Sequence, residues 1–473
     1  MDILESIISW GNHLLWSKVL IVMLIGLGVY FTFKTRFVQF KLFGEMFRLL
    51  KEGVTPDPTQ KKAVSSFQAF CISTASRVGT GNMAGVALAI SLGGPGAVFW
   101  MWLIALIGAA SSFVESTLAQ IYKVKDGNGF RGGPAYYMEK GLNQRWMGVL
   151  FAVLITITFG LVFNSVQSNT IAHALEEAWG IDRGLMGLIL AVVVGLIIFG
   201  GVKRIARVSA VIVPVMAIFY VAVALFVVIK NVTMIPEVLM LIIGNAFGLQ
   251  EVVGGGLGAA LMNGIKRGLF SNEAGMGSAP NAAAAAAVSH PVKQGLIQSL
   301  SVFTDTLIIC SATAFIILMS GIYLDQEING IALTQAALST QVGDWATGFV
   351  AIAILLFAFS SLIGNYYYGE TNIEFIRSSK TWLTIYRLAV IGMVAFGSVA
   401  QLSLVWDMAD LFMGLMAIIN LIAIALLGKF AFAALQDYVE QRREGKDPVF
   451  RADRIEGLVH AECWDNARQR SEK

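Results

Sequence analysis

Long apolar segments constrain this chain more than any other feature of its sequence. About eleven of them reach the roughly twenty residues that an α-helix needs to cross a bilayer. Their approximate spans are 15–33, 66–92, 96–122, 147–174, 184–201, 208–230, 252–288, 293–323, 345–370, 382–402 and 407–430. The runs are continuous and do not alternate in ten-residue pieces, so helices are favoured over barrel strands. Hydrophobic residues make up 56% and charged residues 14% of the 473 positions, which predicts an all-α integral membrane protein.

Basic residues in the connections between the runs predict the orientation. They concentrate after the first, third and fifth runs: Lys34, Arg36, Lys41, Arg48, Lys51, Lys61 and Lys62; Lys123, Lys125, Arg131, Lys140 and Arg145; Lys203, Arg204 and Arg207. Such loops are normally cytoplasmic. We therefore expect a multi-pass protein of the inner (plasma) membrane with its N-terminus outside and its charged C-terminal tail in the cytoplasm. Asp2 and Glu5 precede the first run without a basic cluster, which favours a retained helix over a signal peptide.

Other functional classes find little support in the sequence. Cys71, Cys310 and Cys463 are scattered, and the four histidines lack ligand spacing, so neither a disulfide framework nor a metal cluster is predicted. The net charge of +3 mostly reflects the inner loops, which leaves nucleic-acid binding unsupported. His290 has no evident nucleophile partner, so we do not expect an enzyme. A channel lacks a filter motif.

Two short stretches share a frame of Arg, Asn, Ala and Gly at matching offsets. They are residues 77–85 (Arg-Val-Gly-Thr-Gly-Asn-Met-Ala-Gly) and 267–275 (Arg-Gly-Leu-Phe-Ser-Asn-Glu-Ala-Gly), and each lies inside an apolar run. Polar residues and clustered glycines are costly in hydrocarbon unless they line a cavity. Helix breaks at corresponding places in two halves of a chain indicate a transporter binding site. The alternative is glycine for tight helix packing.

The position of these stretches predicts the domain organisation. We expect a peripheral N-terminal helix and cytoplasmic connection in 1–65, a first repeat in 66–230, a short extracellular helix in 231–251, a second repeat in 252–430 and a cytoplasmic tail in 431–473. Each repeat has five spans, an odd number, so the second enters the membrane from the opposite side. The predicted fold is therefore a five-plus-five inverted repeat with two discontinuous helices, in which the tail begins as an amphipathic helix and ends in disorder.

The first break, at Val78 to Asn82, can bind charges of both signs. Ser73, Thr74 and Ser76 in the same helix can serve the freed backbone groups. Amides at the start of a half-helix attract an anion, and carbonyls at the end of the preceding half-helix coordinate a cation. The carboxylate of an amino acid together with a sodium ion matches this pairing.

The second break predicts a tight pocket wall. Phe270 and Met276 lie among small residues, and Pro280 can start a half-helix before a run of alanines. Small walls suit small substrates. For the alanines alone, ordinary helix packing is the favoured interpretation.

Two further helices carry polar residues at useful spacing. Gly160, Asn164, Gln167 and Ser168 form a stripe that should face inward, where the amides can contact substrate or bond to other helices. Ser360 and Ser361, with a carbonyl one turn earlier at Phe357, offer oxygen ligands to a hard cation. Paired serines in membrane helices also commonly bond their own backbone, so the residues alone leave cation binding open.

Charged residues inside the apolar runs need partners or water. They are Arg77, Glu115, Arg267, Glu273, Asp305 and Glu370. We expect the arginines to form structural ion pairs or gates. A carboxylate such as Glu273 or Asp305 could instead carry a coupling proton.

These motifs resemble the alanine/glycine:cation symporter family, also called the sodium:alanine symporters, over essentially the whole chain. The matching segments are 271–285 (Ser-Asn-Glu-Ala-Gly-Met-Gly-Ser-Ala-Pro-Asn-Ala-Ala-Ala-Ala), 79–85 and 360–370. The resemblance implies a leucine-transporter-type fold of the amino acid, polyamine and organocation transporters. It also implies sodium-driven uptake of alanine or glycine.

The resemblance further implies a set of site residues. The backbone at Thr80 and Gly81 would hold the substrate carboxylate. Sodium, the coupling ion and not a resident cofactor, would bind carbonyls of Ala75, Val78 and Phe357 and the hydroxyls of Ser360 and Ser361. The full set expected to bind substrate is Thr80, Gly81, Asn82, Asn164, Gln167, Phe270, Ser271, Asn272, Gly275 and Met276. A proton-coupled amino acid symporter of the same fold is the alternative, and a channel is a more distant one.

Overall fold

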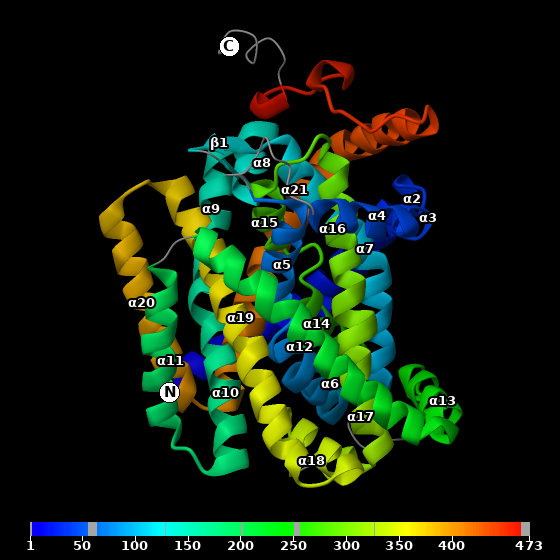
Figure 1. The fold of residues 1–473 in the computed structure, drawn as a ribbon, viewed down its shortest axis with the longest axis vertical. Coiled ribbons are helices and arrows are strands. Elements are labelled where there is room, and N and C mark those ends of the chain that lie inside the picture. Colours follow the sequence, from blue (N-terminus) through cyan, green and yellow to red (C-terminus); the bar gives the residue numbers. More distant parts are fainter. Residues whose placement is uncertain are drawn as a thin grey trace.

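The computed structural model is a bundle of long helices that run roughly along one axis (Figure 1). It describes residues 2–54, 64–127, 129–199, 202–249, 256–325 and 327–464. The longer helices in chain order are α1 (Asp2–Leu14) continuing through η1 (Leu15–Leu20) into α2 (Ile21–Lys34), α4 (Phe43–Val54), α5 (Ser66–Arg77), η3 (Gly81–Gly85) with α6 (Val86–Gly93), α7 (Gly96–Ile121), α9 (Arg145–Ile155) with η4 (Thr156–Phe163) and α10 (Asn164–Trp179), α11 (Arg183–Ile198), α12 (Val202–Lys230), α13 (Ile235–Ala246), α14 (Leu257–Asn272), α15 (Ala279–Ala285), α16 (Pro291–Phe303) with η6 (Thr304–Cys310) and α17 (Ser311–Ser320), α18 (Gly330–Val342), α19 (Trp345–Ile376), α20 (Lys380–Val399) and α21 (Leu402–Arg443).

The chain is an all-helical membrane protein, and every expected span overlaps a helix. Within the described residues, seven helices are long and apolar enough to cross a membrane, or up to eight if a pair bent by 78° between Ala217–Lys230 and Val232–Ala246 counts as one span. The expected number of about eleven is larger because three expected spans are short or interrupted. α11 has 16 residues, and α5/α6 and α14/α15 are each broken. Residues 252–255 of the seventh expected span lie outside the described residues, as do Lys61 and Lys62.

The two broken helices run in opposite directions beside each other. The start of α5 lies next to the end of α15, where Val64 and Ala286 form a parallel β-bridge and the Ala287 amide donates to the Val64 carbonyl at 3.0 Å. α6 packs against α14, and α5 packs against α15. Figure 1 shows α5 and α15 toward the end with the C-terminal tail and α6 toward the opposite end. The breaks therefore face each other in the middle of the bundle.

Local sequence accounts for both breaks. Ser65 opens α5 with a capping box, in which its Oγ accepts from the Gln68 amide at 3.2 Å and Gln68 Oε1 accepts from the Ser65 amide at 3.0 Å. Val78, at the end of α5, is extended, with φ −78° and ψ 92°. In the second break, Gly275 and Gly277 adopt φ of +84° and +87°, which glycine tolerates best. A proline in the first turn then starts α15.

The connection after α7 contains regular structure that its basic residues alone do not predict. The expected cytoplasmic loop at 123–146 contains a hairpin of β1 (Val124–Asp126) and β2 (Gly129–Arg131), followed by helix α8 (Pro134–Gly141). Most of α8 is buried below the second break, and Asn281 on α15 lies against Gly133 at its start. The basic residues of this connection predicted a cytoplasmic loop, but they carried no signal for this packing.

The tail also differs from the expectation. α21 continues without interruption to Arg443, whereas its span was expected to end near 430 with a separate amphipathic helix after it. Two short 3-10 turns, η8 (Ala452–Arg454) and η9 (Glu462–Trp464), follow. The Phe450 amide donates to the Ser289 carbonyl at 2.9 Å, and the Trp464 indole donates to the Gln120 carbonyl at 2.8 Å. The expected disordered end, 465–473, lies outside the described residues.

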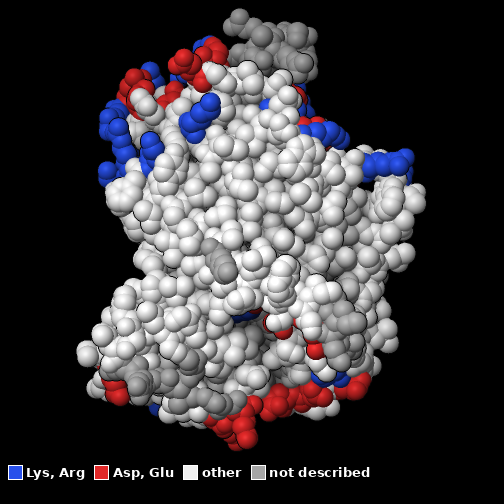
Figure 2. Space-filling view, turned by 180° about the vertical axis from the view of Figure 1, so that it is seen from behind, with Lys and Arg blue, Asp and Glu red and all other residues white. Residues whose placement is uncertain are grey.

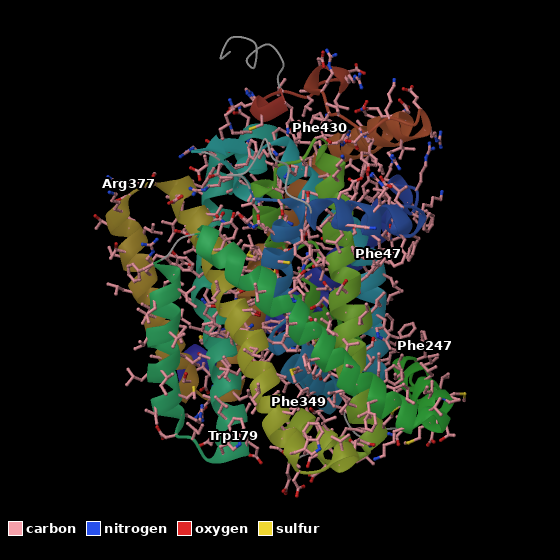
Figure 3. The ribbon with its side chains drawn as sticks, in the orientation of Figure 1. Phe47, Trp179, Phe247, Phe349, Arg377 and Phe430 are labelled. Carbon is pink, nitrogen blue, oxygen red and sulfur yellow. The ribbon has the colours of Figure 1, made fainter. Side chains whose placement is uncertain are left out.

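Charges gather at the two ends of the bundle and leave an apolar band between them (Figure 2). Lys and Arg lie mainly at the end with the tail, and Asp and Glu dominate the opposite rim. Aromatic side chains lie toward both ends, with Phe47 and Phe430 nearer the tail and Trp179 and Phe349 near the far end (Figure 3). This distribution is typical of a protein embedded in a bilayer.

Candidate functional site

At the first break, backbone groups lose the hydrogen bonds that a continuous helix would give them. After α5 ends at Arg77, the Gly79 amide donates to Asn82 Oδ1 at 2.9 Å, so a side chain of the next half-helix serves an amide of the break. The break is fully buried. The Gly79 and Thr80 amides and the Ala75 and Val78 carbonyls therefore bond to side chains instead of to a continuing helix.

Five oxygen atoms converge on the inner side of this break. Ser361 Oγ, on α19, lies 2.8 Å from the Ala75 carbonyl, 3.3 Å from that of Val78 and 3.2 Å from that of Phe357. Ser360 Oγ donates to the same Phe357 carbonyl at 2.7 Å. Two hydroxyl protons are shared among all these oxygens, so most lone pairs in the cluster receive no hydrogen. Such an oxygen-rich group is what a hard cation prefers.

Glycine at position 79 is required by this arrangement. A Cβ there would overlap Ser361 Oγ and would lie 2.9 Å from Gln167 Oε1. The oxygen cluster and the Gln167 side chain thus lie on either side of one residue. The structure brings together all five residues expected to bind sodium.

The Thr80 backbone and side chain form a small acceptor-binding cradle. Gln167 Oε1, on α10, accepts from the Thr80 amide at 3.0 Å and from Thr80 Oγ1 at 2.6 Å. A carboxylate oxygen can accept from the same two donors. Across the cradle, an ideal Cβ at Gly81 would lie 3.0 Å from Phe270 Cδ1 and 3.1 Å from Ser271 Cα, so the two breaks touch here.

Three aromatic rings form a wall beside the cradle. Phe270 lies between Phe163, at 4.5 Å between ring centroids, and Trp406 on α21, at 4.7 Å. Asn164, next to Phe163, donates its Nδ2 to the Gly160 carbonyl at 3.0 Å, and its Oδ1 has no partner among the described residues. The wall is apolar except for the Asn164 amide and the indole N–H of Trp406.

The expected polar stripe on the fourth span divides between two faces. Gln167 reaches Thr80, but Gly160 lies against Tyr386 on α20, and Ser168 donates to the Ser165 carbonyl beside Gly397. A π-helical segment, η4, precedes α10 and shifts the register of the helix. The regular spacing assumed from the sequence therefore fails for this stripe.

Asp305 connects the outer halves of both broken helices. Its Oδ1 accepts from Asn82 Nδ2 at 2.7 Å, and its Oδ2 accepts from Ser271 Oγ at 2.8 Å and Thr306 Oγ1 at 2.9 Å. The carboxylate is buried and forms no ion pair with the described residues. A negative charge next to the cradle, satisfied by neutral donors only, can attract a cation or hold a proton.

The second break rests on α7 and α21. Glu115 accepts from the amides of Gly275 and Gly277, both at 3.1 Å, and from Asn420 Nδ2 at 2.8 Å. Gly275 faces Leu421 and Ser111, and Met276 is buried in the core. Asn272 Oδ1 accepts from the Ala274 amide at 3.0 Å. These contacts place Asn272, Gly275 and Met276 in the supported loop, whereas Thr80, Gly81, Phe270 and Ser271 meet across the cradle.

The buried charges have varied partners. Arg267 forms an ion pair with Asp410, and Arg387 with Glu370 at 3.3 Å. Arg77 donates to the Gln298 carbonyl at 3.3 Å and Ser112 Oγ at 3.3 Å, and forms no ion pair with the described residues. Glu273 accepts from Ser76 Oγ at 2.7 Å. Of the expected ion pairs or gates, Arg267 forms an ion pair, whereas Arg77 has neutral partners among the described residues.

Sequence reasoning missed four residues that surround the cradle or support it. They are Phe163, Trp406, Asp410 and Asn420. Asp410 and Asn420 are polar residues within the last apolar run, which was a usable signal. Trp406 and Phe163 carry no such signal, because aromatic residues are common in any apolar helix.

Comparisons of the sequence with known proteins agree on one kind of relative. The family model described as the sodium:alanine symporter family matches residues 1–452. A probable sodium/glutamine symporter of Bacillus subtilis is 63% identical over 98% of this chain and 96% of its own length. A sodium/alanine symporter of Methanococcus maripaludis is 36% identical over 93% of this chain and 98% of its own length. Among solved structures, a manganese transporter of Eremococcus coleocola has a TM-score of 0.49 at 16% identity, covering 85% of this chain and 82% of that one.

Proposed function

Because the chain belongs to the sodium:alanine symporter family, we propose that it couples sodium entry to uptake of a small neutral amino acid, alanine or glycine. The proposed fold is a five-plus-five inverted repeat that alternates between outward-open and inward-open states. Two broken helices lying antiparallel support this architecture. Because the family consists of transporters, the chain is not an enzyme.

The observation that carries the proposal is the oxygen cluster one residue away from the cradle. Sodium would bind the carbonyls of Ala75, Val78 and Phe357 and the hydroxyls of Ser360 and Ser361. These ligands belong to the end of α5 and to α19. A bound ion would therefore add to the contacts that already join these helices, which include the hydrogen bonds of Ser361 and that of Ser76 Oγ to Asn365 at 2.8 Å. Sodium would thereby stabilise one arrangement of the bundle, which is the requirement for coupling.

The substrate carboxylate would take the place of Gln167 Oε1 on the Thr80 donors. The positive end of the half-helix that begins at Gly81 favours this charge. Gln167 would then bond to the substrate, and Phe270 would close over the aliphatic part. Asn82, Ser271 and Asp305 are bonded to one another and would lie near the substrate ammonium.

Packing at the tail end supports a pathway that is closed on that side. α8, the β1–β2 hairpin and the tail residues lie across the ends of α7, α15 and α16. Figure 2 shows a hollow in the opposite half, with atoms of charged residues in it. With the basic end in the cytoplasm, this would be an outward-facing arrangement, and the N-terminus would lie outside.

Glutamine is a second candidate substrate, favoured by the probable sodium/glutamine symporter at 63% identity. Proton coupling is a second candidate for the driving ion. It is favoured by the unpaired charge of Asp305 and by a relative of Bacillus sp., 39% identical, whose name is sodium/proton-dependent alanine carrier protein.

Purified protein in liposomes tests the proposal. An inward sodium gradient should drive accumulation of labelled alanine, and the Ser360→Ala/Ser361→Ala double variant should lose it while remaining folded. Accumulation in sodium-free buffer under a pH gradient would favour the proton-coupled alternative. Uptake by the double variant equal to that of the natural protein would refute the assigned sodium site.

A further inference from the structure

Three buried side chains on the outer side of the aromatic wall keep polar atoms without partners. They are Arg267 (Nε and Nη1), Asp410 (Oδ1) and Trp406 (Nε1), and none of these atoms is hydrogen-bonded to the described residues. The three residues are only 4%, 3% and 4% exposed. Buried polar atoms nearly always have partners, so unpartnered atoms at neighbouring positions indicate a binding site.

The ion pair itself explains why atoms are left over. Arg267 Nη2 bonds Asp410 Oδ2, and Lys266 Nζ approaches the same oxygen at 3.4 Å. Two cationic groups therefore share one carboxylate oxygen, although arginine commonly pairs with both oxygens of a carboxylate. The arrangement leaves a free N–H donor edge on Arg267 and a free acceptor on Asp410.

The ion pair of Arg267 and Asp410 lies about the length of a short side chain away from the cradle. Ser271, whose Cα touches the Gly81 position, is four residues after Arg267 on α14, which corresponds to about 6 Å along the helix axis. The Arg267 guanidinium lies 4.6 Å from the Trp406 ring, and that ring lies 4.7 Å from Phe270. A continuous aromatic surface thus leads from the cradle to the ion pair.

We propose that the free edges of Arg267, Asp410 and Trp406 form a carboxamide-binding subsite, selective for a neutral amino acid with two methylenes and a terminal amide. This inference rests on the proposed function, because the substrate carboxylate must lie on Thr80 and Gly81. The carboxamide oxygen accepts from Arg267 or Trp406, and its NH2 group donates to Asp410 Oδ1. The two methylenes lie along Phe270 and Trp406.

The chemistry of the subsite discriminates against substrates of similar size. A side-chain carboxylate has no hydrogen to donate, so it faces Asp410 Oδ1 with like charge. An aliphatic chain of the same length leaves both buried edges unpaired, and sites built to hydrogen-bond a substrate reject analogues that lack the partner. Alanine does not reach the subsite, so its binding is independent of it.

The test is competition for sodium-driven uptake of labelled alanine in proteoliposomes. Unlabelled glutamine should inhibit at concentrations at least about tenfold lower than norleucine or glutamate. Arg267→Lys retains the charge facing Asp410 but removes the free guanidinium edge, so the glutamine-to-norleucine ratio should fall at least about fivefold. Trp406→Phe should lower it less. Lys266→Gln is the matched control, because Lys266 reaches the already partnered oxygen of Asp410 and the Trp16 ring and bonds none of the free edges. The ratio should stay within about twofold.

Equal inhibition by glutamine and norleucine in the natural protein would overturn the subsite. An equal loss of potency for both competitors in Arg267→Lys would also overturn it, because a simple gate acts on every substrate alike. If Arg267→Lys does not transport, the shift in unfolding temperature caused by each amino acid in detergent with sodium supplies the same ratio. Absence of sodium-driven uptake by the natural protein would refute the proposed function, whereas selective stabilisation by glutamine would still support the subsite.

Discussion

Ser361 Oγ lies 2.8 Å from the carbonyl oxygen of Ala75, although 286 positions separate the two residues in the sequence. The contact joins α19 to the end of the inner half of α5, at the point where the helix stops. Backbone carbonyls there are free because the next residues are not helical. A serine hydroxyl and free carbonyls at this place are the basis of the proposed sodium site.

Ser361→Ala removes one oxygen from that cluster and should raise the sodium concentration required for half-maximal uptake at least about tenfold, which corresponds to about 1.4 kcal/mol. Initial rates of alanine uptake over a series of sodium concentrations measure this. Ser398→Ala, which removes a buried serine that donates within α20, is the control and should leave the sodium dependence unchanged. Equal sodium dependence in both variants would contradict the role of Ser361.

Gly79→Ala should abolish uptake because its Cβ would overlap Ser361 Oγ and crowd Gln167 Oε1. The change displaces both the proposed sodium ligand and the side chain over the cradle. Gly392→Ala is a suitable comparison, since nothing lies within 4 Å of its Cβ position and alanine favours a helix by about 1 kcal/mol. Uptake assays on both variants, normalised to folded protein by size-exclusion chromatography, would decide. Full activity of Gly79→Ala would show that the cluster tolerates displacement.

Glu115→Ala leaves the amides of Gly275 and Gly277 and the Asn420 side chain without their acceptor. Buried groups that lose a partner cost about 1–3 kcal/mol each, so thermal unfolding should occur at a clearly lower temperature. The loop between α14 and α15 should also become more accessible, and a cysteine introduced at Ala274 would report this by its rate of alkylation. Unchanged stability and alkylation would mean that Glu115 does not hold the loop.

Lys123, just beyond the end of α7, should make stability depend on pH. Burial lowers the pKa of its ammonium group to about 7, although Gln120 Oε1 at 2.7 Å and the Phe130 ring at 4.0 Å favour the charged form. An unfolded lysine, with a pKa of about 10.4, keeps its proton between pH 7 and 10, whereas the folded one releases it, so stability rises with pH in this window.

Between pH 7 and 9, the titration of Lys123 should raise the free energy of unfolding by up to about 2 kcal/mol. Unfolding temperatures of the natural protein and of Lys123→Met at pH 7, 8 and 9 measure it by difference. The natural protein should gain stability relative to the variant as the pH rises. A constant difference across the three values would show that Lys123 keeps its proton in the folded protein.

The long helices could be predicted from the sequence because the bilayer demands uniform apolar length, and each expected span overlaps a helix. Both breaks were also predictable. Gly79, Gly81, Gly275 and Gly277 lie beside polar residues, and this combination is unfavourable in an unbroken helix that faces lipid. The antiparallel placement of α5 and α15 agrees with the odd number of spans expected in each repeat.

Features that depend on packing across distant segments escaped prediction. Trp406 meets Phe270 only because α21 crosses α14, and aromatic residues in apolar helices give no sign of such a contact. The π-helical segment before Asn164 divides a stripe that regular spacing would align. α8 is buried by packing against α7, α19 and α21, which the sequence of the connection cannot reveal.

The most direct test of sodium-coupled transport is uptake of labelled alanine into liposomes under three conditions: an inward sodium gradient, an equal potassium gradient and a pH gradient without sodium. The account predicts transient accumulation above the outside concentration with sodium alone, and none with potassium or protons. Equal accumulation in the absence of sodium would contradict it.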